Sequence, residues 1–172
     1  GPNPMSAMTE PKWVLYGANG YTGELTARMA AAAGMRPILA GRNAGAVGAL
    51  AQALGLEART AALDEPAALD RMLAGTTAVL HCAGPFVHTS APMAAACLRS
   101  GVHYLDITGE IEVFEALAAR YGSAIAADVM LLPGAGFDVV PSDCLAAHLN
   151  RRLTTATRLV LGIRSSGSIS RG

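Results

Sequence analysis

The sequence is poor in charge, and what it lacks excludes several classes of protein. Only 15% of its 172 residues are charged and the formal net charge is zero, so attraction to nucleic acid or to an anionic membrane surface is weak. A single lysine, Lys12, precedes the first apolar run. Neither the Tyr-x-x-x-Lys pair of short-chain dehydrogenases nor a Gly-Lys-Ser/Thr phosphate loop can therefore form, and a Gly-x-Ser-x-Gly nucleophile elbow is absent as well.

Long apolar runs and metal-ligand spacings are also missing. No run approaches the roughly 20 apolar residues that a membrane-spanning helix needs. The four histidines show neither i, i+4 pairing nor a Cys-x-x-Cys partner, so we expect no metal site. The three cysteines, Cys82, Cys97 and Cys144, are odd in number and lie in apolar surroundings. This usage predicts reduced, buried thiols in a cytoplasmic protein.

Short β-rich runs alternate with helical segments along nearly the whole chain. Such alternation predicts an α/β fold with a doubly wound, mostly parallel sheet and helices on both of its faces. The expected strands cover residues 13–16, 37–40, 58–63, 78–82, 103–106, 130–132 and 158–163. The expected helices cover residues 22–33, 44–54, 66–74, 91–99, 111–126 and 141–151.

Capping chemistry predicts several helix boundaries. Asp64 is the expected N-cap of a helix that has Pro66 in its first turn. Ser90 is likewise the expected N-cap of the next helix, which has Pro92 in its first turn. No helix is therefore expected to begin between the fourth strand and Ser90. Four glycines stand just after helical runs, where a left-handed residue commonly ends a helix: Gly34, Gly55, Gly75 and Gly101.

The most informative motif is a glycine turn between the first strand and the first helix. Gly17, Gly20 and Gly23 follow the apolar run 13–16 with the spacing Gly-x-x-Gly-x-x-Gly. A strand that turns into a helix on glycines presents free backbone N–H groups and the positive end of a helix dipole. The alternative is a tight connection without a ligand, but the matched strands and helices favour a phosphate site in a dinucleotide-binding, Rossmann-like domain. The intervening residues expected to contact the ligand are Asn19, Tyr21 and Thr22.

The end of the second strand indicates which dinucleotide binds. Domains that prefer NAD usually carry a carboxylate there, about 20 residues beyond the glycine loop, for the ribose 2′-hydroxyl. This strand instead ends in Gly41, Arg42 and Asn43. A guanidinium can donate two hydrogen bonds to a 2′-phosphate, and the amide of Asn43 can add a donor. The alternative, a solvated Arg42, places a cation at the positive end of a helix without an anionic partner. We therefore expect NADP(H).

Two further loops are expected to meet the cofactor. Asp64 follows the third strand, where its carboxylate can accept from the adenine amino group in addition to capping a helix. After the fourth strand come Cys82, Ala83, Gly84 and Pro85, whose small side chains let backbone approach the pyrophosphate and the ribose beside nicotinamide. Cys82 itself is expected to be a small packed residue rather than a nucleophile.

Together these motifs carry a family resemblance. The chain resembles the cofactor-binding half of the saccharopine dehydrogenase-like oxidoreductases over about residues 12–172, and within that family the branch of the mycobacterial trans-acting enoyl reductases. One departure is the segment after Phe86, which reads Val-His-Thr-Ser where relatives typically continue with an aromatic-glycine pair. The segments that carry the resemblance are 17–23, 41–42, 82–86, 96–97, 103–110 and 136–143.

The resemblance implies an NADP-dependent enzyme that moves a hydride between nicotinamide and a small-molecule or acyl-chain substrate, such as the double bond of a polyketide chain. Residues 1–10 are expected to be a cleavage scar and linker, residues 11–155 the nucleotide domain, and residues 156–172 the start of a truncated substrate domain. This fragment alone is then expected to be inactive, and a homo-oligomer would form through the missing part. A non-catalytic NADP sensor or scaffold and a saccharopine-type amino acid dehydrogenase stay open as alternatives.

Three carboxylates are candidates for proton transfer near the nicotinamide. Asp106 and Glu110 flank the end of the fifth strand, and Asp138 flanks the loop after the sixth together with a fourth carboxylate, Asp143. Each has a structural alternative: Glu110 can stabilise the helix that follows it, and Asp138 and Ser142 can cap the helix near residue 141. A general acid needs a geometry that sequence does not give, so the catalytic residue stays undetermined at this point.

Overall fold

A sheet of parallel strands organises the protein, for which a computed structural model describes residues 11–164. The strand order is β3-β2-β1-β4-β5-β6, and every paired neighbour is parallel. The strands are β1 (Trp13–Tyr16), β2 (Ile38–Gly41), β3 (Ala58–Thr60), β4 (Ala78–His81), β5 (His103–Asp106) and β6 (Leu131–Leu132). The helices are α1 (Tyr21–Ala32), α2 (Ala44–Leu54), α3 (Pro66–Leu73), α4 (Phe86–Ser100), α5 (Ile111–Ala118), α6 (Tyr121–Ala127) and α7 (Val140–Arg152). The predicted doubly wound fold is confirmed.

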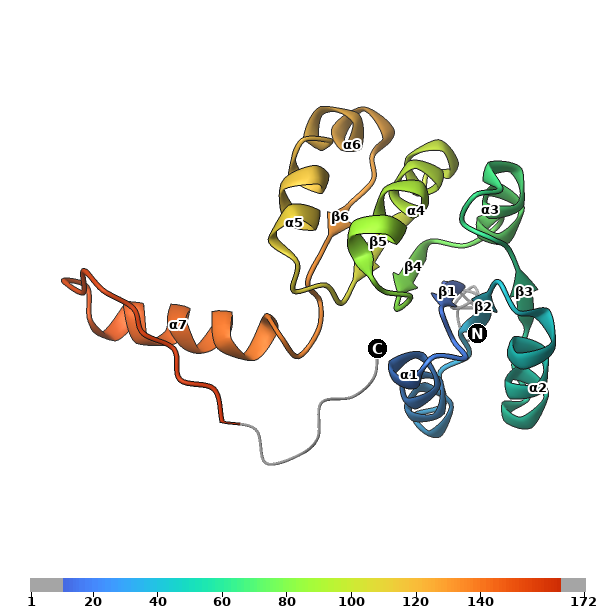
Figure 1. Cartoon of the computed structure of the whole chain (residues 1–172), viewed down its shortest axis with the longest axis horizontal. Coiled ribbons are helices and arrows are strands. Elements are labelled where there is room, and N and C mark those ends of the chain that lie inside the picture. Colours follow the sequence, from blue (N-terminus) through green and yellow to red (C-terminus); the bar gives the residue numbers. More distant parts are fainter. Residues whose placement is uncertain (1–10, 165–172) are drawn as a thin grey trace, which may run out of the picture.

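The central strands are apolar because helices cover both faces of the sheet. Leu15 pairs in register with Leu39 on β2 and with Leu80 on β4, and Leu15 and Leu39 are fully buried. Continuous apolar runs of this kind are typical of buried parallel strands. One core lies between the sheet and α1 and α2, and a larger one lies between the sheet and α3, α4 and α5. Figure 1 shows the two sets of helices on opposite sides of the strands.

The order of the strands reverses between β1 and β4. From β1 the chain passes through β2 to β3 at one edge of the sheet, and from β4 it passes through β5 to β6 at the other edge. Right-handed crossovers in these two directions place their helices on opposite faces. The carboxyl ends of β1 and β4 therefore form a topological switch point, the usual ligand site of such sheets.

Two helices differ from the sequence-based expectation. The helix expected over 91–99 begins at Phe86 and contains Pro92, so the prediction that no helix begins before Ser90 is wrong. Ser90 is buried within this helix and does not cap it. The helix expected over 111–126 is divided into α5 and α6, with Ala119 and Arg120 between them. Gly34, Gly55, Gly75 and Gly101 all have positive φ, as predicted.

The last described part of the chain stands apart from the sheet. Figure 1 shows α7 extending away from the other helices, and none of its residues is buried. The strand expected over 158–163 is wrong, because these residues have no regular structure and are exposed. A β-rich sequence forms a strand only where a neighbouring strand accepts its hydrogen bonds, and none lies beside this segment in the described part of the chain.

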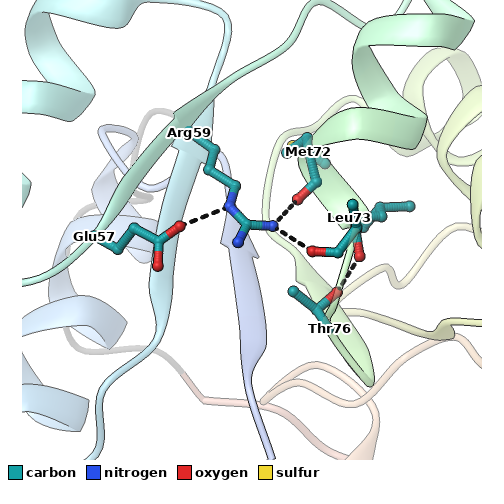
Figure 2. Close-up of polar contacts among 6 residues, drawn as sticks. Glu57, Arg59, Met72, Leu73 and Thr76 are labelled. Carbon is teal, nitrogen blue, oxygen red and sulfur yellow. Dashed lines mark hydrogen bonds and ion pairs between the residues drawn. The ribbon is translucent and has the colours of Figure 1, made fainter.

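An arginine joins the edge of the sheet to α3. The Arg59 guanidinium on β3 donates to the backbone oxygens of Met72 and Ala74, at 2.7 Å and 2.8 Å, and also to Glu57 at 2.8 Å. Figure 2 shows the guanidinium between the strand and the end of the helix. Thr76 completes the arrangement by donating to the carbonyl oxygen of Leu73 at 2.7 Å. The last carbonyls of α3, which lack partners within the helix, are thereby satisfied.

Replacing this arginine tests its contribution to stability. Arg59→Ala leaves helix-end carbonyls without their charged donor, so we expect the free energy of unfolding to fall by about 2 kcal/mol. Urea unfolding followed by circular dichroism measures the change. The control Arg28→Ala removes an exposed i, i+4 pair with Glu24 and is expected to cost about 0.5 kcal/mol or less. Equal losses in the two variants would contradict the assigned role of Arg59.

Candidate dinucleotide site

The glycine turn is fixed by its own backbone. Gly17 has φ +80°, and its N–H and that of Ala18 donate to the carbonyl oxygen of Ala40 at 2.8 Å and 3.1 Å. These bonds tie the turn to the end of β2. A Cβ atom at Gly23 would lie 2.1 Å from the carbonyl oxygen of Gly17, so no other residue fits without moving the helix. The third glycine therefore permits close packing of α1 against the turn.

Of the two helices that follow the strands of the switch point, α1 after β1 and α4 after β4, α1 is the one with an open N-terminus. Its N-cap, Gly20, makes no side-chain hydrogen bond. The first turn of α2 is capped by the Asn43 side chain, which accepts from the N–H of Ala46 at 3.0 Å. The first turn of α4 is capped by the carboxylate of Glu110. The unpartnered N–H groups and positive dipole end of α1 are therefore the seat for an anion.

The structure brings Arg42 and Asp64 to the same part of the edge. Both are exposed, Arg42 directly after β2 and Asp64 in the turn between β3 and α3. Both lie close enough to the Tyr16 hydroxyl to affect its pKa. Burial raises this pKa; Arg42 opposes the shift and Asp64 adds to it. The hydroxyl itself donates to the carbonyl oxygen of Ala61 at 2.9 Å. A guanidinium thus stands beside the expected adenosine end of the site, with a carboxylate near it.

The capping role expected for Asp64 is wrong, and Asn43 has a capping role that was not expected. Asp64 is not the N-cap of α3, because Glu65 holds that position and makes no side-chain cap bond. The carboxylate of Asp64 is therefore free of the role that competed with ligand binding. Asn43 caps α2 through its Oδ1 atom, so only its NH₂ group is left to donate to a ligand.

The loop after β4 lies against the glycine turn. A Cβ atom at Gly17 would lie 2.9 Å from the Ala83 nitrogen and 3.0 Å from the Ala83 Cβ. Gly84 and Pro85 follow and are exposed. Burial raises the pKa of the Cys82 thiol to about 12, so the thiol stays protonated near neutral pH and is a poor nucleophile. The structure therefore supports the packing role predicted for Cys82.

Asp106 is buried and holds two loops together. Its Oδ1 atom accepts from the N–H groups of Thr108 at 3.0 Å and of Gly134 at 2.9 Å, and its Oδ2 atom accepts from the Tyr104 hydroxyl at 2.6 Å. Hydrogen bonds from three donors stabilise a buried carboxylate. Such a carboxylate cannot reach a substrate, so the geometry does not support Asp106 as a proton donor.

The other two carboxylates have different surroundings. Glu110 accepts from the N–H groups of Phe86 at 3.0 Å and of Val87 at 2.8 Å. It therefore caps α4 and not α5, the helix that follows it, where it makes no side-chain cap bond. Asp138 is exposed beside Gly109, and the N-cap of α7 is Val139, so the capping role expected for Asp138 is wrong. Asp138 is left as the exposed carboxylate of the three.

His81 is a feature of the site that sequence reasoning missed. It is fully buried at the end of β4, and its ring centroid lies 5.5 Å from that of Tyr16, 5.4 Å from Phe86 and 6.1 Å from Tyr104. Within residues 11–164, neither of its ring nitrogens has a hydrogen-bond partner. Burial lowers its pKa to about 4, against a smaller opposing effect of the Thr89 backbone. The alternation of residues along β4 could have indicated its burial, because His81 lies two residues after Val79 and shares its buried strand face.

Because His81 is buried in its neutral form, we expect the folded protein to lose stability in acid. The unfolded chain takes up a proton near pH 6.5 and the folded chain near pH 4, so stability is lost as the pH falls through this window. Between about pH 7 and pH 4.5 we expect wild type to lose about 2 kcal/mol more unfolding free energy than His81→Leu. Urea unfolding at pH 7 and at pH 4.5 measures this difference in unfolding free energy. His88→Gln, which replaces an exposed histidine, is the control. Equal losses in wild type and His81→Leu would contradict this account.

Metal and membrane features can be assessed for the described part of the chain. No group of three or more metal-ligating side chains occurs within residues 11–164. No helix in that range is long and apolar enough to cross a membrane. Cys97 is buried and Cys82 partly so, but Cys144 is exposed on α7, so the expectation of three buried thiols is wrong for this residue.

The sheet, its switch point and the open N-terminus of α1 define a class of protein, the dinucleotide-binding α/β domains of Rossmann type. The chain belongs to one family within that class: residues 13–132 match the saccharopine dehydrogenase NADP binding domain. This match confirms the resemblance seen in the sequence and the choice of NADP(H) as the cofactor.

Curated relatives that match the chain come from mycobacteria. A Mycobacterium tuberculosis protein that is provisionally named as a trans-acting enoyl reductase is 38% identical over an alignment of 144 residues. The alignment covers 76% of this chain and 33% of that protein. A trans-acting enoyl reductase of Mycobacterium ulcerans is 34% identical over an alignment of 161 residues, which covers 86% of this chain and 37% of that protein. The chain thus spans about a third of the length of the curated relatives it matches.

Solved structures support the fold. Saccharopine dehydrogenase (L-Glu forming) from Saccharomyces cerevisiae superposes with a TM-score of 0.73 at 18% identity, covering 84% of this chain and 31% of that one. Triphenylmethane reductase from Citrobacter, solved in complex with NADP(H), gives a TM-score of 0.54 at 20% identity, covering 67% and 46%. At these identities the likeness shows the arrangement of strands and helices alone.

Proposed function

We propose that this chain is the NADP(H)-binding part of an oxidoreductase that transfers a hydride between nicotinamide and an organic substrate. One observation carries the proposal. The open N-terminus of α1 lies at the switch point, and the neighbouring strand ends in a guanidinium where NAD-binding domains place a carboxylate. An anion seat beside a second cationic group suits a dinucleotide with an additional phosphate.

Each part of the cofactor has residues that would hold it. The free N–H groups at the start of α1, those of Asn19 and of residues 21–23, would bind the pyrophosphate. The N–H of Gly20 donates to the carbonyl oxygen of Gly17 at 3.0 Å and holds the turn. Arg42 would bind the 2′-phosphate with two hydrogen bonds, since its guanidinium is exposed and planar. The free NH₂ group of Asn43 would add a donor, and Asp64 would accept from the adenine amino group. The remaining half of the cofactor would follow the backbone of Ala83 and Gly84 toward the nicotinamide.

The bound nicotinamide would supply the hydride, and the protein would supply position and a proton. The carboxylates of Asp106 and Glu110 accept hydrogen bonds from backbone N–H groups of neighbouring loops, and this engages them within the protein. Asp138 is exposed near the end of β5, so of the three carboxyl groups it is the one that could meet a substrate and, in its protonated form, donate a proton. The proposed role rests on its exposure and on its place at the carboxyl edge of the sheet.

The proposed substrate is the double bond of an acyl or polyketide chain, because mycobacterial relatives at 34% and 38% identity are named as enoyl reductases. We propose that the nucleotide domain covers residues 11–155 and that residues 156–172 lead into a substrate domain. The length of the relatives, about three times that of this chain, supports this division. The complete protein is then expected to reduce substrate, and the 172-residue chain to bind cofactor without turnover.

Titration calorimetry of the 172-residue chain with NADPH and NADH tests the proposal. We expect wild type to bind NADPH more tightly, and Arg42→Ala to weaken NADPH binding by about tenfold to a hundredfold through loss of the 2′-phosphate contact. NADH affinity is expected to change little.

The control for charge removal is Arg71→Ala, an exposed arginine in the last turn of α3. It is expected to leave both affinities unchanged. Equal affinity of wild type for NADPH and NADH would contradict the role proposed for Arg42, and failure to bind either nucleotide would contradict the proposed function as a whole.

A further inference from the structure

A continuous chain of hydrogen bonds runs along the carboxyl edge of the sheet, on the side of β4, β5 and β6. Gly134, after β6, donates to Asp106 at the end of β5. Asp106 accepts from the N–H of Thr108, whose hydroxyl oxygen accepts from the N–H of Glu110 at 3.0 Å. The Glu110 carboxylate then accepts from the start of α4. Three loops that are distant in sequence are thereby linked at the edge where the nicotinamide half of a dinucleotide lies.

Glu110 is the member of this chain that reaches the nucleotide loop. The N-cap of α4 is Pro85, which has no side-chain acceptor. Each carboxylate oxygen of Glu110 accepts from one N–H, those of Phe86 and Val87. A carboxylate at the positive end of a helix is stabilised by the helix dipole and by charge-assisted hydrogen bonds. The cap comes from another element, so it fixes where α4 begins relative to β5.

The beginning of α4 in turn fixes the loop that meets the glycine turn. Thr89, in the first turn of α4, donates through its hydroxyl to the carbonyl oxygen of Ala83 at 2.6 Å. Ala83 lies so close to Gly17 that a Cβ atom there would be 2.9 Å from the Ala83 nitrogen. The distance between loop 83–85 and the glycine turn therefore depends on the position of the first turn of α4. With a dinucleotide bound as proposed above, loop 83–85 would border the nicotinamide half of the cofactor.

We infer that Glu110 is a positioning residue that holds loop 83–85 in place for the nicotinamide half of the bound cofactor. The inference rests on the proposed function. Glu110 acts through backbone N–H groups and does not transfer a proton. Its carboxylate also occupies the N-terminus of α4, so the pyrophosphate is directed to the open N-terminus of α1.

The two halves of the cofactor provide a selective test. Adenosine 2′,5′-bisphosphate carries the 2′-phosphate and one phosphate of the pyrophosphate, but lacks the nicotinamide half. We expect Glu110→Ala to weaken NADPH binding to the 172-residue chain by about tenfold, and to leave adenosine 2′,5′-bisphosphate binding within about twofold of wild type. Glu110→Gln keeps one acceptor oxygen for the α4 N–H groups, so we expect it to restore NADPH affinity to within about threefold of wild type.

Glu115→Ala, an exposed glutamate on α5, is the matched control and is expected to bind both ligands as wild type does. Thermal unfolding of each variant shows whether it is folded. If Glu110→Ala does not fold, NADPH binding by Glu110→Gln provides the test. Unchanged NADPH binding in both Glu110 variants would overturn the inference alone. Equal weakening of both ligands would overturn it in favour of a general structural role. Failure of wild type to bind NADPH would overturn the proposed function, and this inference with it.

Discussion

The structure depends on the close approach of α1 to the turn that precedes it. Only a residue without a side chain can stand at Gly23, because a Cβ atom there would lie 2.1 Å from the carbonyl oxygen of Gly17. This contact seats the helix directly against the end of β1, next to the point where the strand order reverses. Since Gly20 provides no side-chain cap, the first N–H groups of α1 stay available to an anion. The packing constraint and the binding site are therefore the same feature.

The distribution of charge along the carboxyl edge follows from which carboxylates are used internally. Asp106 and Glu110 are both engaged by backbone N–H groups of neighbouring loops. They hold the β4, β5 and β6 side of the edge together. On the other side, Arg42 is exposed at the end of β2. The first side is thus suited to fixed geometry near the nicotinamide, and the second to recognition of phosphate near the adenosine.

Features that depend on local chemistry could be predicted from the sequence. The glycine turn, the apolar central strands and the positive-φ glycines after helices each follow from a few adjacent residues. The start of α4 could not, because its cap is Glu110, more than 20 residues away in the chain. The surroundings of the His81 ring depend on packing between elements, because its aromatic neighbours come from β1, α4 and β5. The strand expected over 158–163 failed because strand formation requires a neighbour, which the sequence pattern does not show.

Backbone amide chemical shifts provide the most direct test of the central claim, that the open N-terminus of α1 is the anion seat. Heteronuclear NMR of the isotope-labelled chain, with and without NADPH, reports on each N–H separately. The account predicts the largest shifts among residues 19–23, at the free N–H groups of Asn19 and of residues 21–23. It predicts smaller shifts at Phe86 and Val87, whose N–H groups are already bonded to Glu110. Shifts concentrated at Phe86 and Val87, with residues 19–23 unchanged, would contradict it.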